Sequence, residues 1–234
     1  EKSKLYLHNI SRKNLIKFFR LHDDLLKIFK QIDKDKNIHQ AITKYRGLRL
    51  IKQDPWQCIV SFICSSNSNI LRIKKNINSV CERFGERIEM DRKVFYTFPS
   101  SDKILSDKKK LMQCGLGYRC SYLYETAKVA DKVFIKRLEK ANYETAKGCL
   151  LNLRGVGDKV AECILLFSLN HNNAFPVDTW IKKGMLELYG NEIKRLNKSK
   201  NISEKSIREF AQLYFGSYAG YAQQYLFHWR RHHV

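Results

Sequence analysis

Apolar residues recur along most of the chain at spacings of three and four, which place them on one face of a helix. Clear examples run from Leu15 to Ile32, from Trp56 to Cys64 and from Leu71 to Phe84. Apolar and polar residues nowhere alternate over a useful length, so the signals for strands are weak. The pattern predicts an all-α protein.

Further helices are expected in the second half of the chain. Asp178 and Ser203 are residue types whose side chains accept hydrogen bonds from the first turn of a helix. Glycines at 115–117 and 155–157 mark turns between helices. The expected ranges are 101–114 (one or two short helices), 118–133, 143–153, 159–169, 179–189, 204–214 and 218–231.

The charge of the chain is strongly positive. Its 44 Lys and Arg residues against 23 Asp and Glu give a formal net charge of +21. Such a surface attracts polyanions, and nucleic acid is the first candidate because binding releases the counterions of its phosphates. A generally lysine-rich proteome, ribosomal binding or a membrane surface would also account for the charge. No apolar stretch approaches the roughly 20 residues that span a bilayer, so we expect no membrane insertion.

The cysteines indicate the compartment. There are 7 of them, an odd number, and none forms a C-x-x-C pair. In a chain of this length the count argues against a disulfide framework and favours a reducing environment. No secretory signal pattern opens the sequence. We therefore expect an intracellular protein.

The most informative stretch joins two expected helices through Gly155-Val156-Gly157. Glycine permits a positive φ and the close approach of another backbone. The second helix then presents free N–H groups and a partial positive charge to a phosphate oxygen, which is how a helix-hairpin-helix holds DNA. Two glycines between helices also fit a plain tight turn, so this motif alone leaves both interpretations open.

Lys159 and Asp178 are the candidate catalytic pair. Lys159 lies on the first turn of the second hairpin helix, where the dipole disfavours a cation and so favours a free amine nucleophile. Asp178 follows after Phe175-Pro176-Val177, which would return a carboxylate to the neighbourhood of the amine. Taken singly, an exposed surface lysine and a capping aspartate explain the two residues equally well.

Several motifs in order resemble one family. The sequence GVGDKVAEC at 155–163, followed by FPVD at 175–178, is similar to the helix-hairpin-helix GPD superfamily of base-excision DNA glycosylases. More narrowly, the chain resembles the eukaryotic-type 8-oxoguanine DNA glycosylase/AP lyases from Gly47 to Phe227, with a weaker match before it. The remaining blocks that carry this resemblance are RLIKQDP at 49–55, SFICSSN at 61–67, GLGYR at 115–119 and YAGYAQ at 218–223.

The resemblance implies a chemistry for these residues. Lys159 would attack C1′ of the damaged nucleotide and expel the base, while Asp178 stabilises the sugar cation. A Schiff base then forms, and β-elimination can nick the strand. The damaged base must leave the stack to be reached. The pocket that receives it maps to Gln223, Phe227, Cys163, Phe167 and Pro176.

The resemblance also implies contacts to the rest of the duplex. Asn67, Arg72 and Arg119 match residues that recognise the cytosine opposite the lesion, and Tyr118 matches the wedge that fills the vacated stack. A second set matches residues that contact the DNA backbone, namely Gly155, Gly157, Val160 and Asn69. Main-chain carbonyls at the hairpin hold a monovalent or calcium ion in the family, and the matching positions are Leu151, Leu153 and Val156.

The chain departs from the family at several points. Animal members carry an N-terminal β-sheet domain with a carbonyl that contacts the oxidised purine, and this sequence begins close to where that domain ends. Trp180 stands in place of a histidine, Arg230 in place of an acidic residue, and Arg154 in place of a proline. No cysteine follows Cys163, so the iron–sulfur cluster of related glycosylases is not expected.

These observations predict two helical lobes with the hairpin at the cleft between them. We expect residues 1–53 to form N-terminal helices that pack with the C-terminal lobe, 54–153 to form a central lobe, and 154–234 to form the hairpin and the C-terminal lobe. The expected activity is removal of 8-oxoguanine opposite cytosine from double-stranded DNA, by a nuclear monomer that requires no cofactor. The alternatives are a non-enzymatic DNA-binding module and a glycosylase for another oxidised purine.

Overall fold

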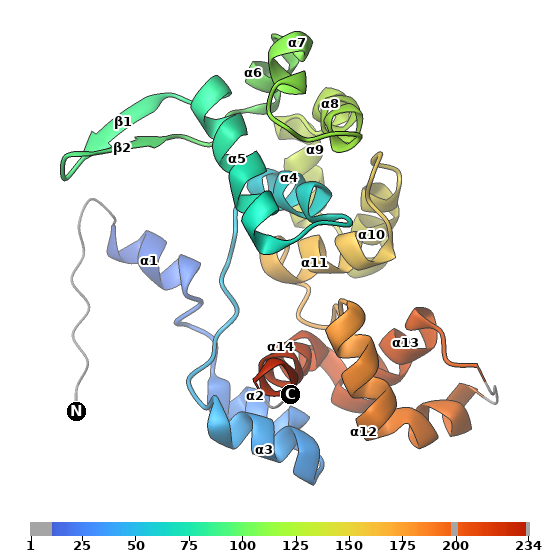
Figure 1. Ribbon diagram of the computed structural model, residues 1–234. Helices are drawn as coiled ribbons and strands as arrows, with labels where there is room; N and C mark the ends of the chain where they lie inside the picture. Colours follow the sequence, from blue (N-terminus) through green and yellow to red (C-terminus); the bar gives the residue numbers. More distant parts are fainter. Residues whose placement is uncertain (1–10, 198–200, 233–234) are drawn as a thin grey trace. The chain divides into compact units, whose positions relative to one another are not determined.

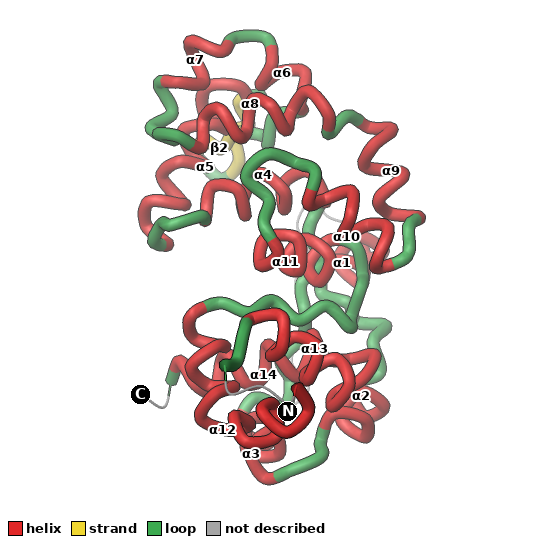
Figure 2. Tube along the Cα trace, turned by 90° about the vertical axis from the view of Figure 1, so that its right-hand side faces the viewer, coloured by secondary structure: helices red, strands yellow, loops and turns green. Residues whose placement is uncertain are grey.

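The computed structural model describes residues 11–197 and 201–232 of the chain. These residues fall into two compact units, one formed by residues up to 53 together with those from 170 onward, and one formed by residues 54–169. Both units are built almost wholly from helices (Figures 1 and 2). The all-α expectation is therefore confirmed. Within the described ranges, no helix combines the length and apolar character needed to cross a membrane.

The unit that combines residues 11–53 with those from 170 onward is organised around its last helix. Its elements are α1 (Arg12–Phe18), α2 (Leu25–Ile32), α3 (Lys36–Lys44), α12 (Thr179–Asn197), α13 (Glu204–Phe215), the 3₁₀ turn η1 (Gly216–Tyr218) and α14 (Ala219–Arg231). Helix α14 packs against α2, α3, α12 and α13. Tyr221 and Tyr225 of α14 are fully buried, as are Ile28 and Ile38. The N-terminal helices thus share a core with the C-terminal part.

The unit of residues 54–169 is built on the packing of two helices. Its elements are α4 (Pro55–Ser65), α5 (Ile70–Phe84), β1 (Arg87–Met90), β2 (Lys93–Tyr96), α6 (Ser101–Leu105), α7 (Lys108–Met112), α8 (Arg119–Val129), α9 (Lys132–Lys140), α10 (Tyr143–Leu151) and α11 (Asp158–Ser168). Helix α11 packs against both α4 and α10. Ile59 and Ile63 of α4 and Ile164 and Leu165 of α11 are fully buried.

The boundary between the units corrects the expected division. The sequence predicts a C-terminal lobe that begins at residue 154, whereas in the structure residues up to 169 belong to the central unit. The physical reason is α11, whose apolar residues are buried against α4 and α10. The second helix of the hairpin therefore belongs to the same core as the first.

Two long expected helices are each interrupted. The segment 15–32 breaks between α1 and α2, where Arg20 has a φ of +50°. The segment 118–133 breaks after Val129, and Asp131 then starts α9 by accepting a hydrogen bond from the Phe134 amide. In both places a local backbone preference ends a helix that the apolar spacing alone would continue.

The short β-hairpin is an element that the sequence analysis missed. Strands β1 and β2 pair antiparallel, and the connecting residues Asp91 and Arg92 both have positive φ, at 50° and 61°. Two positive φ values in a two-residue loop match the twist of a hairpin. Every residue of the two strands is exposed. Because neither face is buried, the sequence lacks the alternation that normally identifies a strand.

Candidate active site

The hairpin between α10 and α11 depends on one glycine in particular. Gly155 has a φ of +86°, and a Cβ built on it would lie 2.6 Å from Cδ2 of Tyr122. Both the backbone and the packing therefore require glycine. Gly157 precedes α11 with a φ of −95°, and a Cβ there would meet nothing within 4 Å. The first turn of α11 accordingly begins at a residue without a side chain to cap it, which leaves its N–H groups for an anion.

Contacts from α8 hold the hairpin in place. Thr126 donates its hydroxyl to the carbonyl of Arg154 over 3.2 Å. The Arg154 guanidinium lies 5.6 Å from the centre of the Tyr122 ring. Within the loop, the Val156 amide donates to the carbonyl of Leu153 over 3.1 Å. Val160 is buried at 7% exposure, so its side chain belongs to the core and only its backbone suits the expected DNA contact.

A buried ion pair locks the two hairpin helices together. Glu162 of α11 is fully buried, and its Oε1 lies 2.7 Å from Nζ of Lys147 on α10. The same oxygen accepts a hydrogen bond from the Tyr143 hydroxyl over 2.5 Å. Lys147 also lies 3.3 Å from Asp158 at the start of α11. A buried carboxylate with both a cation and a hydroxyl partner fixes the relative position of the helices that carry it.

Lys159 lies half-buried on the first turn of α11. Its Nζ is 5.2 Å from the centre of the Phe62 ring on α4. Phe62 in turn stacks on Phe167, with ring centres 5.9 Å apart and an interplanar angle of 10°. Cys163, one helical turn from Lys159, is buried at 3% exposure. The structure thus brings Lys159 and Phe167 to a common aromatic surface.

Phe62 is the residue that links these groups, and the sequence analysis did not single it out. A signal was present, because Phe62 lies in the SFICSSN block that supports the resemblance. An aromatic face beside the amine can hold it through cation–π attraction. The same face offers an apolar wall to a planar base.

The remaining expected site residues lie in the other unit. Asp178 caps α12, where its Oδ1 accepts a hydrogen bond from the Ile181 amide over 2.8 Å. Gln223 is 3% exposed, and its Nε2 donates to the carbonyl of Pro176 over 3.1 Å. Phe227 is half-buried beneath the Arg231 guanidinium, 6.0 Å from its ring centre. Pro176 and Gln223, two residues of the expected pocket, are therefore in direct contact.

The residues expected to recognise the opposite base form a second cluster, within the unit of residues 54–169. Asn67 has a φ of +47°, and its Nδ2 lies 3.5 Å from the hydroxyl of Tyr118. The Tyr118 ring lies 4.6 Å from the guanidinium of Arg119. Arg72 is exposed on the first turn of α5, where its amide donates to the capping side chain of Asn69 over 2.9 Å.

Arg119 is buried, whereas a side chain that contacts DNA directly has to be exposed. It is 2% exposed, and its Nε donates to the carbonyl of Ser66 over 2.8 Å. Its Nη2 also donates to Ser66 and, over 2.9 Å, to the carbonyl of Asn67. In this structure the guanidinium therefore holds the loop that carries Asn67 in its left-handed conformation.

Arg230, one of the departures from the family, has a partner that the sequence analysis did not identify. Its Nη2 lies 2.9 Å from Oε2 of Glu187 on α12. Trp180 is 41% exposed near the start of the same helix. Arg230 is therefore paired with a carboxylate of the neighbouring helix α12.

The fold and the hairpin define a protein of the helix-hairpin-helix class. A sequence model described as "HhH-GPD superfamily base excision DNA repair protein" matches residues 60–212. A second, described as "8-oxoguanine DNA glycosylase, N-terminal domain", matches residues 3–59. The chain belongs to the HhH-GPD superfamily of base excision DNA repair proteins. The match at 3–59 extends the resemblance towards the N-terminus, over a region that is helical from Arg12 onward.

Individual relatives agree with this assignment. The chain is 34% identical over 220 residues to the "Probable N-glycosylase/DNA lyase" of Methanothermobacter thermautotrophicus, covering 85% of this chain and 68% of that protein. It is 34% identical over 244 residues to the "N-glycosylase/DNA lyase" of Saccharomyces cerevisiae, covering 92% of this chain and 65% of that one. The chain thus spans about two thirds of the length of these relatives.

A solved structure gives the same result. It is the 8-oxoguanine glycosylase/lyase of Clostridium acetobutylicum in complex with double-stranded DNA that contains cytosine opposite 8-oxoguanine. The two chains are 34% identical with a TM-score of 0.85, over 96% of this chain and 77% of the other. The apo form of the same enzyme superposes with a TM-score of 0.84 at 35% identity, over 94% of this chain and 77% of that one.

Proposed function

We propose that this protein is a bifunctional DNA glycosylase and AP lyase that removes 8-oxoguanine from double-stranded DNA. The observation that carries the proposal is Lys159, half-buried on the first turn of the second hairpin helix with its Nζ 5.2 Å from the Phe62 ring. The names of the two N-glycosylase/DNA lyases and the DNA complex of the clostridial enzyme support it. The net charge of +21 favours a polyanionic substrate.

Each step of the reaction has a residue in the chain. The amine of Lys159 attacks C1′ while the N-glycosidic bond breaks, and the bonding electron pair leaves with the base, which takes up the proton that the attacking nitrogen loses. The carboxylate of Asp178 stabilises the positive charge that develops on the sugar. The resulting adduct opens to a Schiff base between Nζ and C1′. Loss of a proton from C2′ then expels the 3′ phosphate, which is the lyase step.

Borohydride trapping tests this mechanism directly. Borohydride reduces the Schiff base to a stable amine, so the protein should become covalently attached to a duplex that contains 8-oxoguanine opposite cytosine. Lys159→Gln should abolish the attachment, and Lys183→Gln, which removes an exposed lysine from α12, should leave it intact. Trapping on other oxidised purines alone would instead indicate a different lesion, and DNA binding without any trapping would indicate a binding module.

We further propose that the protein prefers lesions opposite cytosine. Arg72 is exposed beside Asn69, and Asn67 and Tyr118 lie together on the loop that Arg119 holds. Guanidinium groups donate to cytosine N3 and O2, and an amide oxygen accepts from its amino group. Arg72→Ala should reduce the ratio of excision rates opposite cytosine and adenine by roughly 5- to 100-fold, the effect of losing one good base contact. Lys75→Ala, on the exposed face of α5, is the matched control.

We also propose that the protein acts as a monomer in the nucleus and requires no cofactor for the reaction. All 7 cysteines are free thiols, which supports a reducing compartment. A structural cation, monovalent or calcium, would be held by the main-chain carbonyls of Leu151, Leu153 and Val156. A donor set made wholly of carbonyl oxygens suits such hard cations. A rise in melting temperature with added Ca²⁺ or K⁺, but not with ionic strength alone, would identify it.

A further inference from the structure

The segment 170–178 leads into α12 and carries two residues of the proposed site, Pro176 and Asp178. Its first half is a compact turn, with Asn170 at a φ of +63°. The Asn172 amide donates to the carbonyl of Asn170 over 3.0 Å, and the Ala174 amide donates to that of His171 over 2.9 Å. A turn of this kind needs outside contacts to hold one conformation.

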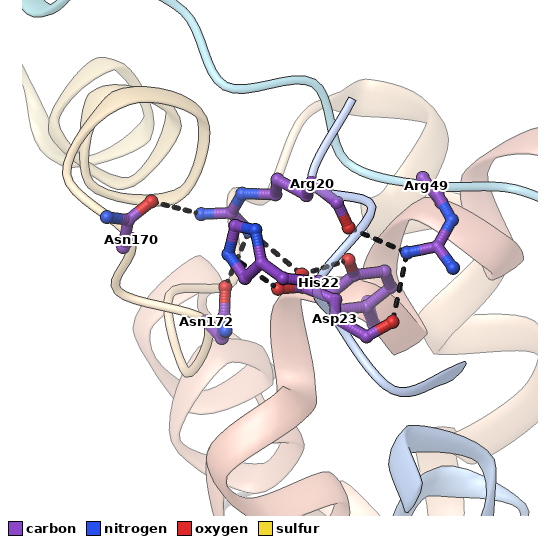
Figure 3. Close-up of polar contacts among 7 residues, drawn as sticks. Arg20, His22, Asp23, Arg49, Asn170 and Asn172 are labelled. Atoms are coloured by element: carbon purple, nitrogen blue, oxygen red, sulfur yellow. Dashed lines mark hydrogen bonds and ion pairs between the residues drawn. The ribbon is translucent and has the colours of Figure 1, made fainter. Parts of the chain in front are cut away.

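Arg20 supplies two of those contacts from a distant part of the chain. Its Nη1 donates to Oδ1 of Asn172 over 2.8 Å, and its Nη2 donates to Oδ1 of Asn170 over 2.7 Å (Figure 3). The guanidinium fork therefore bridges both ends of the turn at once. Arg20 is only 3% exposed, which is rare for an arginine. Its φ of +50° adds strain, because the Cβ of an L-residue in the left-handed region lies too close to the following carbonyl oxygen.

Arg20 is itself fixed by its surroundings. Arg49 donates from Nη1 to the carbonyls of Arg20 and Asp23, over 2.7 and 3.0 Å (Figure 3). The Asp23 carboxylate lies 3.9 Å from Nη1 of Arg20 and accepts the hydroxyl of Tyr221 over 2.5 Å. A buried cation persists only where it is paired and hydrogen-bonded, and these contacts satisfy that condition. The strained, buried arginine is thus held with its fork directed at the two asparagines.

The rest of the segment is tied down by the core of the same unit. The Gly220 amide donates to the carbonyl of Asn172 over 2.8 Å. Gln212 donates to the carbonyl of Asn173 over 3.1 Å, and Gln223 donates to that of Pro176 over 3.1 Å. Phe175 is fully buried. Arg20 is the one charged group in this set, and its two bonds fix the side chains that close the turn.

We infer that Arg20 is a positioning residue for the excision reaction, because it fixes the segment that places Pro176 and Asp178. This inference rests on the proposed function of Asp178. The guanidinium is buried from solvent and acts through Asn170 and Asn172. A shift of about 1 Å in a catalytic group can cost roughly 100-fold in rate, so loosening the segment lowers the rate of excision more than the affinity for DNA.

The test compares Arg20→Met and Arg20→Lys in single-turnover excision of 8-oxoguanine at saturating protein. Arg20→Met should slow excision roughly 10- to 100-fold, with the dissociation constant for lesion DNA within about threefold of the parent. Arg20→Lys should recover part of the rate, because an ammonium reaches one asparagine at a time. In an Asp178→Asn background, Arg20→Met should cause little further loss, since both changes act on the same group.

Tyr189→Phe is the matched control for stability alone. It removes a hydroxyl that donates to Asp35 over 3.1 Å in the same unit, away from the segment. It should lower the melting temperature without slowing excision. If Arg20→Met does not fold, Asn170→Ala and Asn172→Ala take its place. An unchanged rate in folded Arg20→Met, or an equal further loss in the Asp178→Asn background, would overturn the inference.

Amide exchange separates this inference from the proposed function. Arg20→Met should increase exchange at Ala174 and Ile181, whose amides donate within and just after the segment. Unchanged exchange there overturns the positioning role. Absence of excision and trapping by the parent protein on every oxidised-purine duplex overturns the proposed function instead.

Discussion

Replacing Gly155 with alanine should damage the hairpin, and the size of the effect follows from two separate costs. The φ of +86° lies in a region that costs an L-residue about 1–2 kcal/mol. The added Cβ would also lie 2.6 Å from Cδ2 and 2.9 Å from Cβ of Tyr122. Forcing an extra carbon into a packed contact costs about 1–3 kcal/mol. We therefore expect Gly155→Ala to lower the free energy of unfolding by about 2–5 kcal/mol.

Gly155→Ala should also disturb residues outside the hairpin. The Tyr122 ring contacts Tyr118 edge-on at 5.5 Å and lies under the Arg154 guanidinium. A shift of Tyr122 to admit the new methyl group would therefore disturb Tyr118, the proposed wedge residue, and the hairpin together. In a Tyr122→Ala background Gly155→Ala should cost less stability than in the parent, because Cγ and Cδ2 of Tyr122, two of the three atoms nearest the new methyl group, are absent.

Gly157→Ala is the control, because it differs in both respects. Its φ of −95° is open to any residue, and the new Cβ would meet nothing within 4 Å. Stability should stay within about 0.5 kcal/mol of the parent. The methyl group would nevertheless stand at the proposed phosphate contact on the first turn of α11, so affinity for undamaged duplex should fall several-fold.

Urea denaturation followed by circular dichroism measures the first quantity, and fluorescence anisotropy with a labelled undamaged duplex at two salt concentrations measures the second. Equal stability of Gly155→Ala and the parent would refute the packing argument. Full DNA affinity in a folded Gly157→Ala protein would refute the assignment of this hairpin as a phosphate-binding site.

Two further predictions concern stability. Burial raises the pKa of Tyr225 to about 12, and its hydroxyl donates to the carbonyl of Leu48 over 3.0 Å. The stability that this protonated hydroxyl contributes is complete below the unfolded pKa of about 10 and is lost as the pH rises towards 12. The unfolding free energy of the parent should therefore decline in urea melts at pH 9, 10 and 11. Tyr225→Phe should make that decline less steep. Glu162→Gln should cost about 3 kcal/mol, because it leaves Lys147 without its buried partner. Glu187→Gln, which breaks the more exposed pair with Arg230, should cost less than about 1 kcal/mol, and equal costs for the two variants would contradict the role given to burial.

The helices could be predicted from the sequence because their signals are local. Helix α5 runs to Phe84 and ends at Gly85, as the apolar spacing and the glycine indicate. Asp178 caps α12 as expected, although the helix continues to Asn197 instead of ending at residue 189. The continuation buries Ile193. In the sequence this apolar residue stands among charged residues, so the apolar spacing does not indicate that the helix continues.

Features that depend on distant contacts could not be predicted in this way. In the sequence Arg20 cannot be distinguished from the many other basic residues, because its partners Asn170 and Asn172 are about 150 positions away. Arg119 shows a related limit: the resemblance identifies the residue, while only the structure shows its guanidinium bonded to the loop of Ser66 and Asn67. A shared motif predicts which residue type occupies a position. The hydrogen bonds of that side chain depend on the residues that surround it in the fold.

The positions of the proposed catalytic pair, Lys159 and Asp178, along the chain explain why the segment 170–178 needs such firm anchoring. Lys159 belongs to the core of the unit that ends at residue 169, and Asp178 belongs to the other unit, 9 residues past that boundary (178 − 169). An unanchored stretch of that length would leave the carboxylate many conformations, at an entropic cost of about 1–2 kcal/mol for each residue to be ordered during the reaction. The bonds from Arg20, Gly220, Gln212 and Gln223 order the segment before DNA binds. Asp178 is therefore preorganised within its own unit.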